Sequence, residues 1–272
     1  MNTTMYIVVF ALVVVAVVFF IGKARRFRKH SGAPSNRILQ LPHGGEAEGP
    51  VVNGKMHGHW ILRYADGDVH EGMMVNGVEH GDWVIRQANG DVLEGPYVNR
   101  KRHGHWVVRH ADGTVTEGPY MKGKEHGHWV IQPADGGKFE GPMVDGKQHG
   151  HWIERHVDGR SLEGPYVDGK QHGHWVLRLA DGSVFEGPKV NEKMHGHWVM
   201  RLANGDVKQG PMVNSEMHGH WVEQYADGRV SEGSYVNGRI HGRWVERYPD
   251  GREVTAVWKK DDLPDFEFKG FQ

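Results

Sequence analysis

Histidine pairs are the residues of this 272-residue chain whose spacing most directly suggests chemistry. In seven places two histidines flank a single glycine, and side chains at i and i+2 of a strand point to the same face. Each pair would offer a metal ion two ligands. Successive pairs would lie roughly 10 Å apart in a sheet, too far to share an ion held at about 2 Å. We therefore interpret the histidines as structural residues at a turn, with metal binding as the alternative. The pairs are His57/His59, His103/His105, His126/His128, His149/His151, His172/His174, His195/His197 and His218/His220.

Two other patterns imitate catalytic motifs. Residues 164–170 and 141–147 have the glycine and lysine spacing with which a P-loop begins, but Gln171 and Gln148 follow instead of Ser or Thr. The glutamates that precede glycine, such as Glu117 and Glu140, are equivalent copies, whereas an active site is a unique constellation. We expect no enzyme, and we assign no catalytic, cofactor-binding or metal-binding residue.

A row of arginines is the best candidate for a binding feature. Its members are Arg63, Arg86, Arg109, Arg155, Arg178, Arg201 and Arg247. In a sheet they would form an interaction stripe with most members roughly 10 Å from the next. The alternative is cross-strand pairing with the glutamates, which would neutralise the stripe. The sequence favours the pairing.

The element that positions these residues is a repeat of 23 residues without insertion or deletion. Nine tryptophans mark it, at Trp60, Trp83, Trp106, Trp129, Trp152, Trp175, Trp198, Trp221 and Trp244. A fixed period of this size is typical of stacked units that are each too small to bury their own apolar face.

Each unit is predicted to contribute two strands. A β-branched residue follows every Trp, and Asp-Gly or Asn-Gly, as at Asp112-Gly113, is a strong hairpin signal. The Pro of each Glu-Gly-Pro lacks an N–H, so we expect it at a bend or bulge. Eighteen strands would give a ribbon roughly 85 Å long. We expect both faces to be largely solvated, with tyrosines at Tyr97, Tyr120, Tyr166 and Tyr235 bridging neighbouring Trp rings.

The N-terminal segment has a different character. Residues 5–22 carry no charge, and a helix of this length spans roughly 27 Å, close to the thickness of the bilayer core. The basic residues that follow place the repeats on the cytoplasmic side of a single-pass membrane protein. Those residues could also contact anionic lipid headgroups, although a simple stop-transfer flank is favoured. They are Lys23, Arg25, Arg26, Arg28 and Lys29.

The predicted organisation is therefore a short N-terminus (1–4), a transmembrane helix (5–22), a basic flank and linker (23–41), the repeats (42–258) and a C-terminal tail (259–272). The tail is expected to cap the last strand or to act as a docking peptide, and capping is favoured. The chain has no cysteine, and its net charge of −1 gives no bias towards nucleic acid.

The units resemble MORN repeats, as in VTEGPY at 115–120 followed by KGKEHG at 122–127. The family pattern is an aromatic-x-Gly-x-aromatic strand followed by Gly-x-x-His-Gly. This chain has His-Gly-x-Trp where the common form has His-Gly-x-Gly, and it is thus similar to the Gly-x-Trp subclass. The resemblance covers 42–258. It implies an elongated ribbon of β-hairpins used for scaffolding, dimerisation or membrane association, without catalysis in the repeats.

The predicted fold is thus an all-β repeat domain, a single-layer antiparallel meander preceded by one transmembrane α-helix. The main functional hypothesis is a membrane-anchored scaffold that binds another protein along its ribbon, as a homo-oligomer or as a subunit of a larger membrane complex. One alternative is a tether whose ribbon binds anionic lipid. The other is a metal-binding array of histidines.

Overall fold

The structure is a computed structural model that describes residues 36–258 and 265–269. The predicted membrane helix, the basic residues from Lys23 to Lys29 and most of the C-terminal tail lie outside these residues, so these predictions stay predictions. Within the described ranges, no helix combines the length and apolar character that crossing a bilayer requires.

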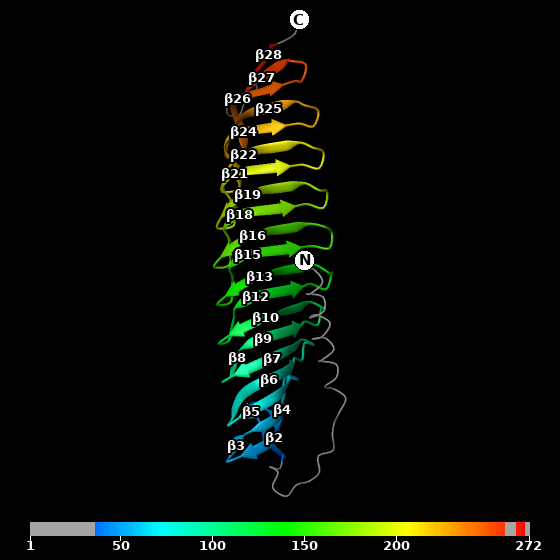
Figure 1. The fold of residues 1–272 in the computed structure, drawn as a ribbon, viewed down its shortest axis with the longest axis vertical. Coiled ribbons are helices and arrows are strands. Elements are labelled where there is room, and N and C mark those ends of the chain that lie inside the picture. Colours follow the sequence, from blue (N-terminus) through cyan, green and yellow to red (C-terminus); the bar gives the residue numbers. More distant parts are fainter. Residues whose placement is uncertain (1–35, 259–264, 270–272) are drawn as a thin grey trace, which may run out of the picture. The chain divides into compact units, whose positions relative to one another are not determined.

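The described residues form one antiparallel β-sheet, in which each longer strand pairs with the longer strands before and after it (Figure 1). The predicted all-β antiparallel meander is confirmed. The longer strands are β1 (Asn36–Gln40), β2 (Gly45–Val52), β4 (Gly58–Tyr64), β5 (Val69–Val75), β6 (Val78–Arg86), β7 (Val92–Val98), β9 (Gly104–Arg109), β10 (Val115–Met121), β12 (Gly127–Gln132), β13 (Lys138–Val144), β15 (Gly150–Arg155), β16 (Ser161–Val167), β18 (Gly173–Arg178), β19 (Val184–Val190), β21 (Gly196–Arg201), β22 (Val207–Val213), β24 (Gly219–Gln224), β25 (Val230–Val236), β26 (Arg239–Arg247), β27 (Glu253–Trp258) and β28 (Asp265–Lys269). Two-residue strands stand between them: β3 (Lys55–Met56), β8 (Lys101–Arg102), β11 (Lys124–Glu125), β14 (Lys147–Gln148), β17 (Lys170–Gln171), β20 (Lys193–Met194) and β23 (Glu216–Met217).

The ends of the sheet extend beyond the predicted repeat boundaries. Strand β1 lies in the predicted linker and pairs with β2. Asn36 to Gln40 stand opposite residues 46–50. At the other end, β28 lies in the predicted tail and pairs with β27. Among the described residues, the sheet therefore includes strands on both sides of the predicted repeats.

The turns at one edge of the sheet are the predicted Asp-Gly hairpins. The N–H of Gly113 donates to the carbonyl of His110 at 2.9 Å, and the N–H of His110 donates to the carbonyl of Thr114 at 2.8 Å. Gly113 has a φ of 90°, which a glycine adopts at low cost. The carboxylate of Asp112 accepts the N–H of Thr114 at 2.8 Å and fixes the turn.

The turns at the opposite edge are tighter. Asp145 and Gly146 both have positive φ, 51° and 82°, which is the geometry of a two-residue type I′ turn. Val144 and Lys147 pair directly across it. The chain thus starts pairing back at once, which creates the short strands that the sequence interpretation did not include.

The His-Gly that follows each short strand is a bulge within a strand, so its interpretation as a turn is wrong. The N–H of His126 donates to the carbonyl of Pro119 at 2.9 Å, and Gly127 next to it has a φ of 86°. Since N–H and C=O of one residue face the same neighbour in an antiparallel ladder, the missing N–H of Pro119 faces this bulge. Placement of the proline at a bulge is therefore confirmed.

Two units without this proline support the same explanation. Met73 and Ser234 stand where seven described units have Pro, and they pair with His80 and His241. There the short and long strands merge into the nine-residue strands β6 and β26. A residue that has an N–H allows the ladder to continue, whereas proline interrupts it.

The tryptophans form the core on one side of the sheet, called the inner face below. Eight of the nine, all except Trp244, are 0–3% exposed. Each ring lies against a glycine of the preceding unit: a Cβ added to Gly118 would stand 2.4 Å from a ring carbon of Trp129. The Nε1–H of Trp129 donates to the carbonyl of Pro119 at 3.2 Å. The expectation of solvation on both faces is therefore wrong for this one, because the rings lie flat on neighbouring backbone.

Tyrosines fill the space between Trp rings, as predicted. Tyr120 makes edge-to-face contacts with Trp106 and Trp129, with centroids 6.2 and 5.3 Å apart. This arrangement favours the ring quadrupoles. Tyr97 connects Trp83 and Trp106 in the same way, so the described chain of rings is continuous from Trp83 to Trp129.

Candidate interaction surface

The opposite side of the sheet, the outer face, carries a row of glutamates between histidines and arginines. Glu140 is contacted by Nε2 of His128 at 3.6 Å from the preceding strand and by Nη1 of Arg155 at 3.1 Å from the next. Lys138 adds a contact at 2.9 Å. Lys138 and then Arg155 lower the pKa of Glu140 below its usual range, although partial burial opposes them. The carboxylate is therefore charged at neutral pH.

All seven arginines of the predicted stripe lie on the outer face, and each contacts the glutamate 15 residues before it. Their side chains remain about half exposed, so each pair contributes little to stability. The pairing reduces the net positive charge that the stripe presents. The pairs are Arg63–Glu48 (3.7 Å), Arg86–Glu71 (3.6 Å), Arg109–Glu94 (3.0 Å), Arg155–Glu140 (3.1 Å), Arg178–Glu163 (3.4 Å), Arg201–Glu186 and Arg247–Glu232 (2.5 Å).

The two histidines of a pair have different partners. Nδ1 of His57 accepts the N–H of Asn76 at 3.4 Å, in the type I′ turn of the next unit. Nε2 of His59 faces Glu71 on the outer face at 3.3 Å. Across the residues that the structure describes, no group of three or more His, Cys, Asp or Glu side chains is placed to hold a metal ion.

An exposed apolar row, which sequence reasoning missed, follows the edge with the type I′ turns. Every member is the residue just before the turn and is 36–45% exposed. In six units it pairs across the turn with a lysine, as Val144 does with Lys147. The 23-residue period could have revealed it, because an apolar residue stands two positions after every Gly-Pro. The members of this edge row are Val52, Val75, Val98, Met121, Val144, Val167, Val190, Val213 and Val236.

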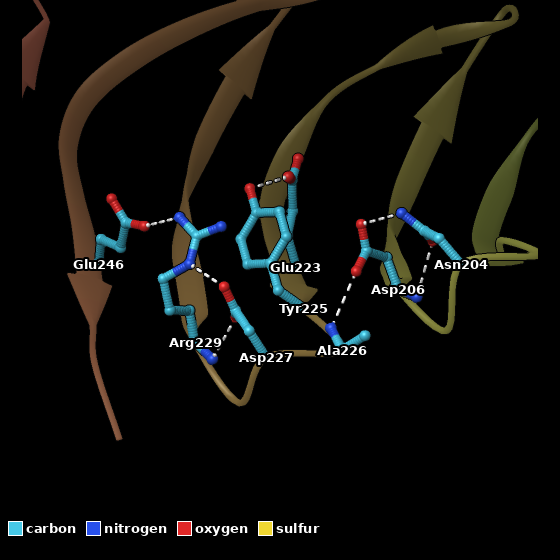
Figure 2. A network of polar contacts seen from close by, with 8 residues as sticks. All are labelled: Asn204, Asp206, Glu223, Tyr225, Ala226, Asp227, Arg229 and Glu246. Atoms are coloured by element: carbon cyan, nitrogen blue, oxygen red, sulfur yellow. Dashed lines mark hydrogen bonds and ion pairs between the residues drawn. The ribbon is translucent and has the colours of Figure 1, made fainter. Parts of the chain in front are cut away.

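The inner face becomes charged towards the C-terminus. Glu223 is only 6% exposed and occupies the position that Leu62 and Ile85 hold in earlier units. Its Oε2 accepts the hydroxyl of Tyr225 at 2.9 Å (Figure 2). The same oxygen lies 3.1 Å from Nζ of Lys208. Burial, followed by the hydrogen bond to Glu223 and its charge, raises the pKa of Tyr225 to about 12.

Polar contacts also connect successive units along the Asp-Gly edge. The carboxylate of Asp206 accepts the N–H of Ala226 in the next turn at 2.9 Å. Arg229 contacts Asp227 of its own turn at 2.7 Å and Glu246 of β26 at 2.6 Å, and so connects the turn to that strand (Figure 2). These contacts connect the turns of successive units along this edge.

No protein-family model matches the chain, and no curated protein matches it. Among solved structures it is similar to the TCP10 domain of Danio rerio CPAP, at 15% identity over 80% of this chain and 92% of that one, with a TM-score of 0.29. It is also similar to the SAS-4 (dCPAP) TCP domain of Drosophila melanogaster, solved in complex with a proline-rich motif of Ana2 (dSTIL). There the identity is 15%, the coverage 87% and 99%, and the TM-score 0.18. Similarity at this level assigns neither function nor partner to this chain.

Proposed function

We propose that the protein is a membrane-anchored scaffold that binds another protein along the edge of its β-ribbon. The observation that carries this proposal is the edge row. Nine apolar side chains are exposed at the same position of successive units, so they form a regular line and not a scatter of single residues. Exposed apolar side chains that are aligned and flanked by polar groups are typical of interaction sites.

The rest of the ribbon supports a binding role. On the outer face the arginines and many histidines are paired with carboxylates, and on the inner face the tryptophans are buried. Among the residues that the structure describes, the edge row contributes nine exposed apolar side chains that still have area to bury. A partner that follows several units would gain from each of them.

Two further parts of the proposal come from the sequence. The apolar residues 5–22 would anchor the ribbon to a membrane, with the repeats on the cytoplasmic side. The MORN-like pattern supports a scaffold without catalysis. The arrangement fits a subunit of a larger membrane complex.

Site-specific photocrosslinking in native membranes tests the proposal. A photoreactive amino acid is placed at Val144 in the edge row and, as a matched control, at Val157 on the opposite edge, which is 68% exposed. We expect a discrete protein adduct from Val144 and none from Val157. Equal labelling at both positions would contradict the proposal. Adducts with lipid alone would favour the lipid tether instead, for which the six lysines beside the row are the supporting observation.

A further inference from the structure

One stretch of the edge row is accompanied by a cluster of positive charge. An open hollow of about 690 Å³ lies between the type I′ turns of the Trp106 and Trp129 units. Five cations line it against a single carboxylate, that of Glu125. The cations are Arg100, Lys101, Arg102, Lys122 and Lys124.

The fold brings these cations together through the backbone. The N–H of Gly123 donates to the carbonyl of Arg102 at 2.8 Å, which fixes the second turn against the short strand of the first. A Cβ added to Gly123 would stand 3.7 Å from Cβ of Lys101. Two turns of adjacent units therefore present their cationic side chains to the same hollow.

Most of this charge is not neutralised by the protein. Within residues 36–258, Lys101, Lys122 and Lys124 make no ion pair, whereas Arg100 contacts Glu79 at 3.2 Å. The guanidinium of Arg102 lies 4.7 Å from the ring centroid of Trp106 and donates to the hydroxyl of Tyr120 at 3.4 Å. It is held in place at the wall of the hollow by aromatic contacts.

The cations occupy turn positions that do not favour them. Arg100 has a φ of 65°, at a position where six other described turns have glycine. Lys122 has a φ of 54°, at a position where the other described type I′ turns have Asn or Asp. Non-glycine residues in the left-handed region are strained, and such strain gathers at functional sites. Glu192 and Ser215 also replace glycine, but only here do the replacements add positive charge.

We propose that this hollow binds a short acidic segment of the partner protein, in which carboxylate side chains alternate with aliphatic ones. This inference rests on the proposed scaffold function. Val98 and Met121 of the edge row pair across the turns with Lys101 and Lys124, so apolar and cationic groups lie side by side. Alternate side chains of an extended segment can then contact lysines and apolar residues in turn.

The size of the hollow and the nature of its cations favour a peptide. A single phosphate group would fill only a small part of about 690 Å³. Three of the five cations are lysines, which act as flexible point charges and not as rigid bidentate forks. A phosphorylated small molecule or a lipid headgroup is the competing outcome of the test.

Binding of a labelled peptide to the full chain in detergent tests the inference. The probe is a fluorescein-labelled decapeptide of alternating Glu and Leu, and its Gln-Leu counterpart is the control peptide. We expect the Lys101→Glu/Lys124→Glu variant to raise the Kd about tenfold. The matched control is Lys147→Glu/Lys170→Glu, which makes the same charge change at equivalent positions and should leave the Kd within about twofold. Equal weakening by both variants, or equal binding of both peptides, would overturn the proposal.

A second variant separates binding from stability. Arg100→Gly with Lys122→Asn restores the residues that favour these turns, so the melting temperature should rise by about 2 °C. At the same time the Kd for the acidic peptide should rise about fivefold. Unchanged binding would show that the two cations are not part of the site.

Two further outcomes separate a peptide site from an anion site, and the role of the hollow from the scaffold function. If inositol hexakisphosphate or vesicles containing phosphatidylserine bind this hollow and the acidic peptide does not, the peptide proposal is wrong. If the peptide fails to bind while Val144 still forms its protein adduct, the inference fails and the scaffold function stands. Loss of that adduct would contradict the scaffold itself.

Discussion

The inner and outer faces of the sheet follow different rules. On the inner face each Trp ring lies on a glycine so closely that even one added methyl group would collide with it. On the outer face the repeat tolerates change: Gln132 and Gln224 replace arginine, and Asp82 replaces the second histidine of a pair. The strict period is therefore imposed by packing at the Trp–Gly contacts, while these outer-face positions vary.

The largest effect is expected from Gly118→Ala. Its methyl group would stand 2.4 Å from the Trp129 ring, and the ring cannot move without leaving Pro119. We expect a loss of about 3 kcal/mol in the free energy of unfolding, measured by urea denaturation.

Gly146→Ala is the control for that experiment. Nothing lies within 4 Å of its added Cβ, and only a φ of 82° opposes the substitution. A loss of about 1 kcal/mol is expected. Equal losses at both sites would mean that the Trp–Gly contact does not set the period.

The next largest effect on the free energy of unfolding is expected from the charged part of the inner face. Glu223→Leu copies the residue of earlier units but leaves Lys208 and the hydroxyl of Tyr225 without their acceptor. We expect a loss of about 2 kcal/mol, most of which the double variant Lys208→Leu/Glu223→Leu should recover. No recovery would show that this end of the inner face is not equivalent to the apolar one.

Alkaline titration of tyrosine absorbance provides a second readout. The raised pKa of Tyr225, about 12, means that the folded state favours the neutral phenol. Its stabilising contribution is complete below the ordinary value of 10.0 and is lost as the pH rises towards 12. In Glu223→Leu the pKa should move down towards 10.0.

A smaller effect distinguishes two buried tryptophans. Nε1 of Trp152 donates to the carbonyl of Pro142 at 2.8 Å, whereas Nε1 of Trp175 is buried without a hydrogen-bond partner. Substitution by Phe should therefore cost about 1 kcal/mol more at Trp152 than at Trp175. Thermal unfolding of the two variants measures the difference, and a greater loss at Trp175 would contradict the explanation.

The smallest effect is expected on the outer face. Arg155→Ala removes a half-exposed pair with Glu140 and should cost about 0.5 kcal/mol. The pKa of Glu140 should rise, because Arg155 helps to lower it. The stabilisation from this carboxylate is complete above the ordinary value of 4.5 and is lost as the pH falls through the lowered pKa. NMR titration of the carboxyl group checks the shift, and a cost above 2 kcal/mol would place this pair with the inner contacts.

Much of the fold could be predicted from the sequence because its signals are local and repeated. The Trp period, the Asp-Gly hairpins and the proline at a bulge follow from residue types alone. The burial of the tryptophans could not be predicted, since it depends on how a ring such as Trp129 lies across the neighbouring strand onto Gly118. The His-Gly bulge was missed because glycine with positive φ serves turns and bulges equally well.

The candidate site was less predictable. The candidate binding features in the sequence were charged and histidine-rich motifs, whereas the edge row consists of valines and one methionine. Their exposure depends on the two-residue turn, which places them at the edge of the sheet. The charged turns at Arg100 and Lys122 break the repeat in the sequence itself, but their convergence depends on the stacking of adjacent units.

The position of each Trp ring on the preceding glycine gives the ribbon a direction of growth. Gly118 and Pro119 are synthesised before Trp129, which lies on the first and donates to the second. A nascent chain that leaves the ribosome can therefore dock each indole onto backbone that is already complete. Assembly can proceed one unit at a time as the chain is synthesised. No unit depends on the C-terminus for the glycine on which its Trp ring packs.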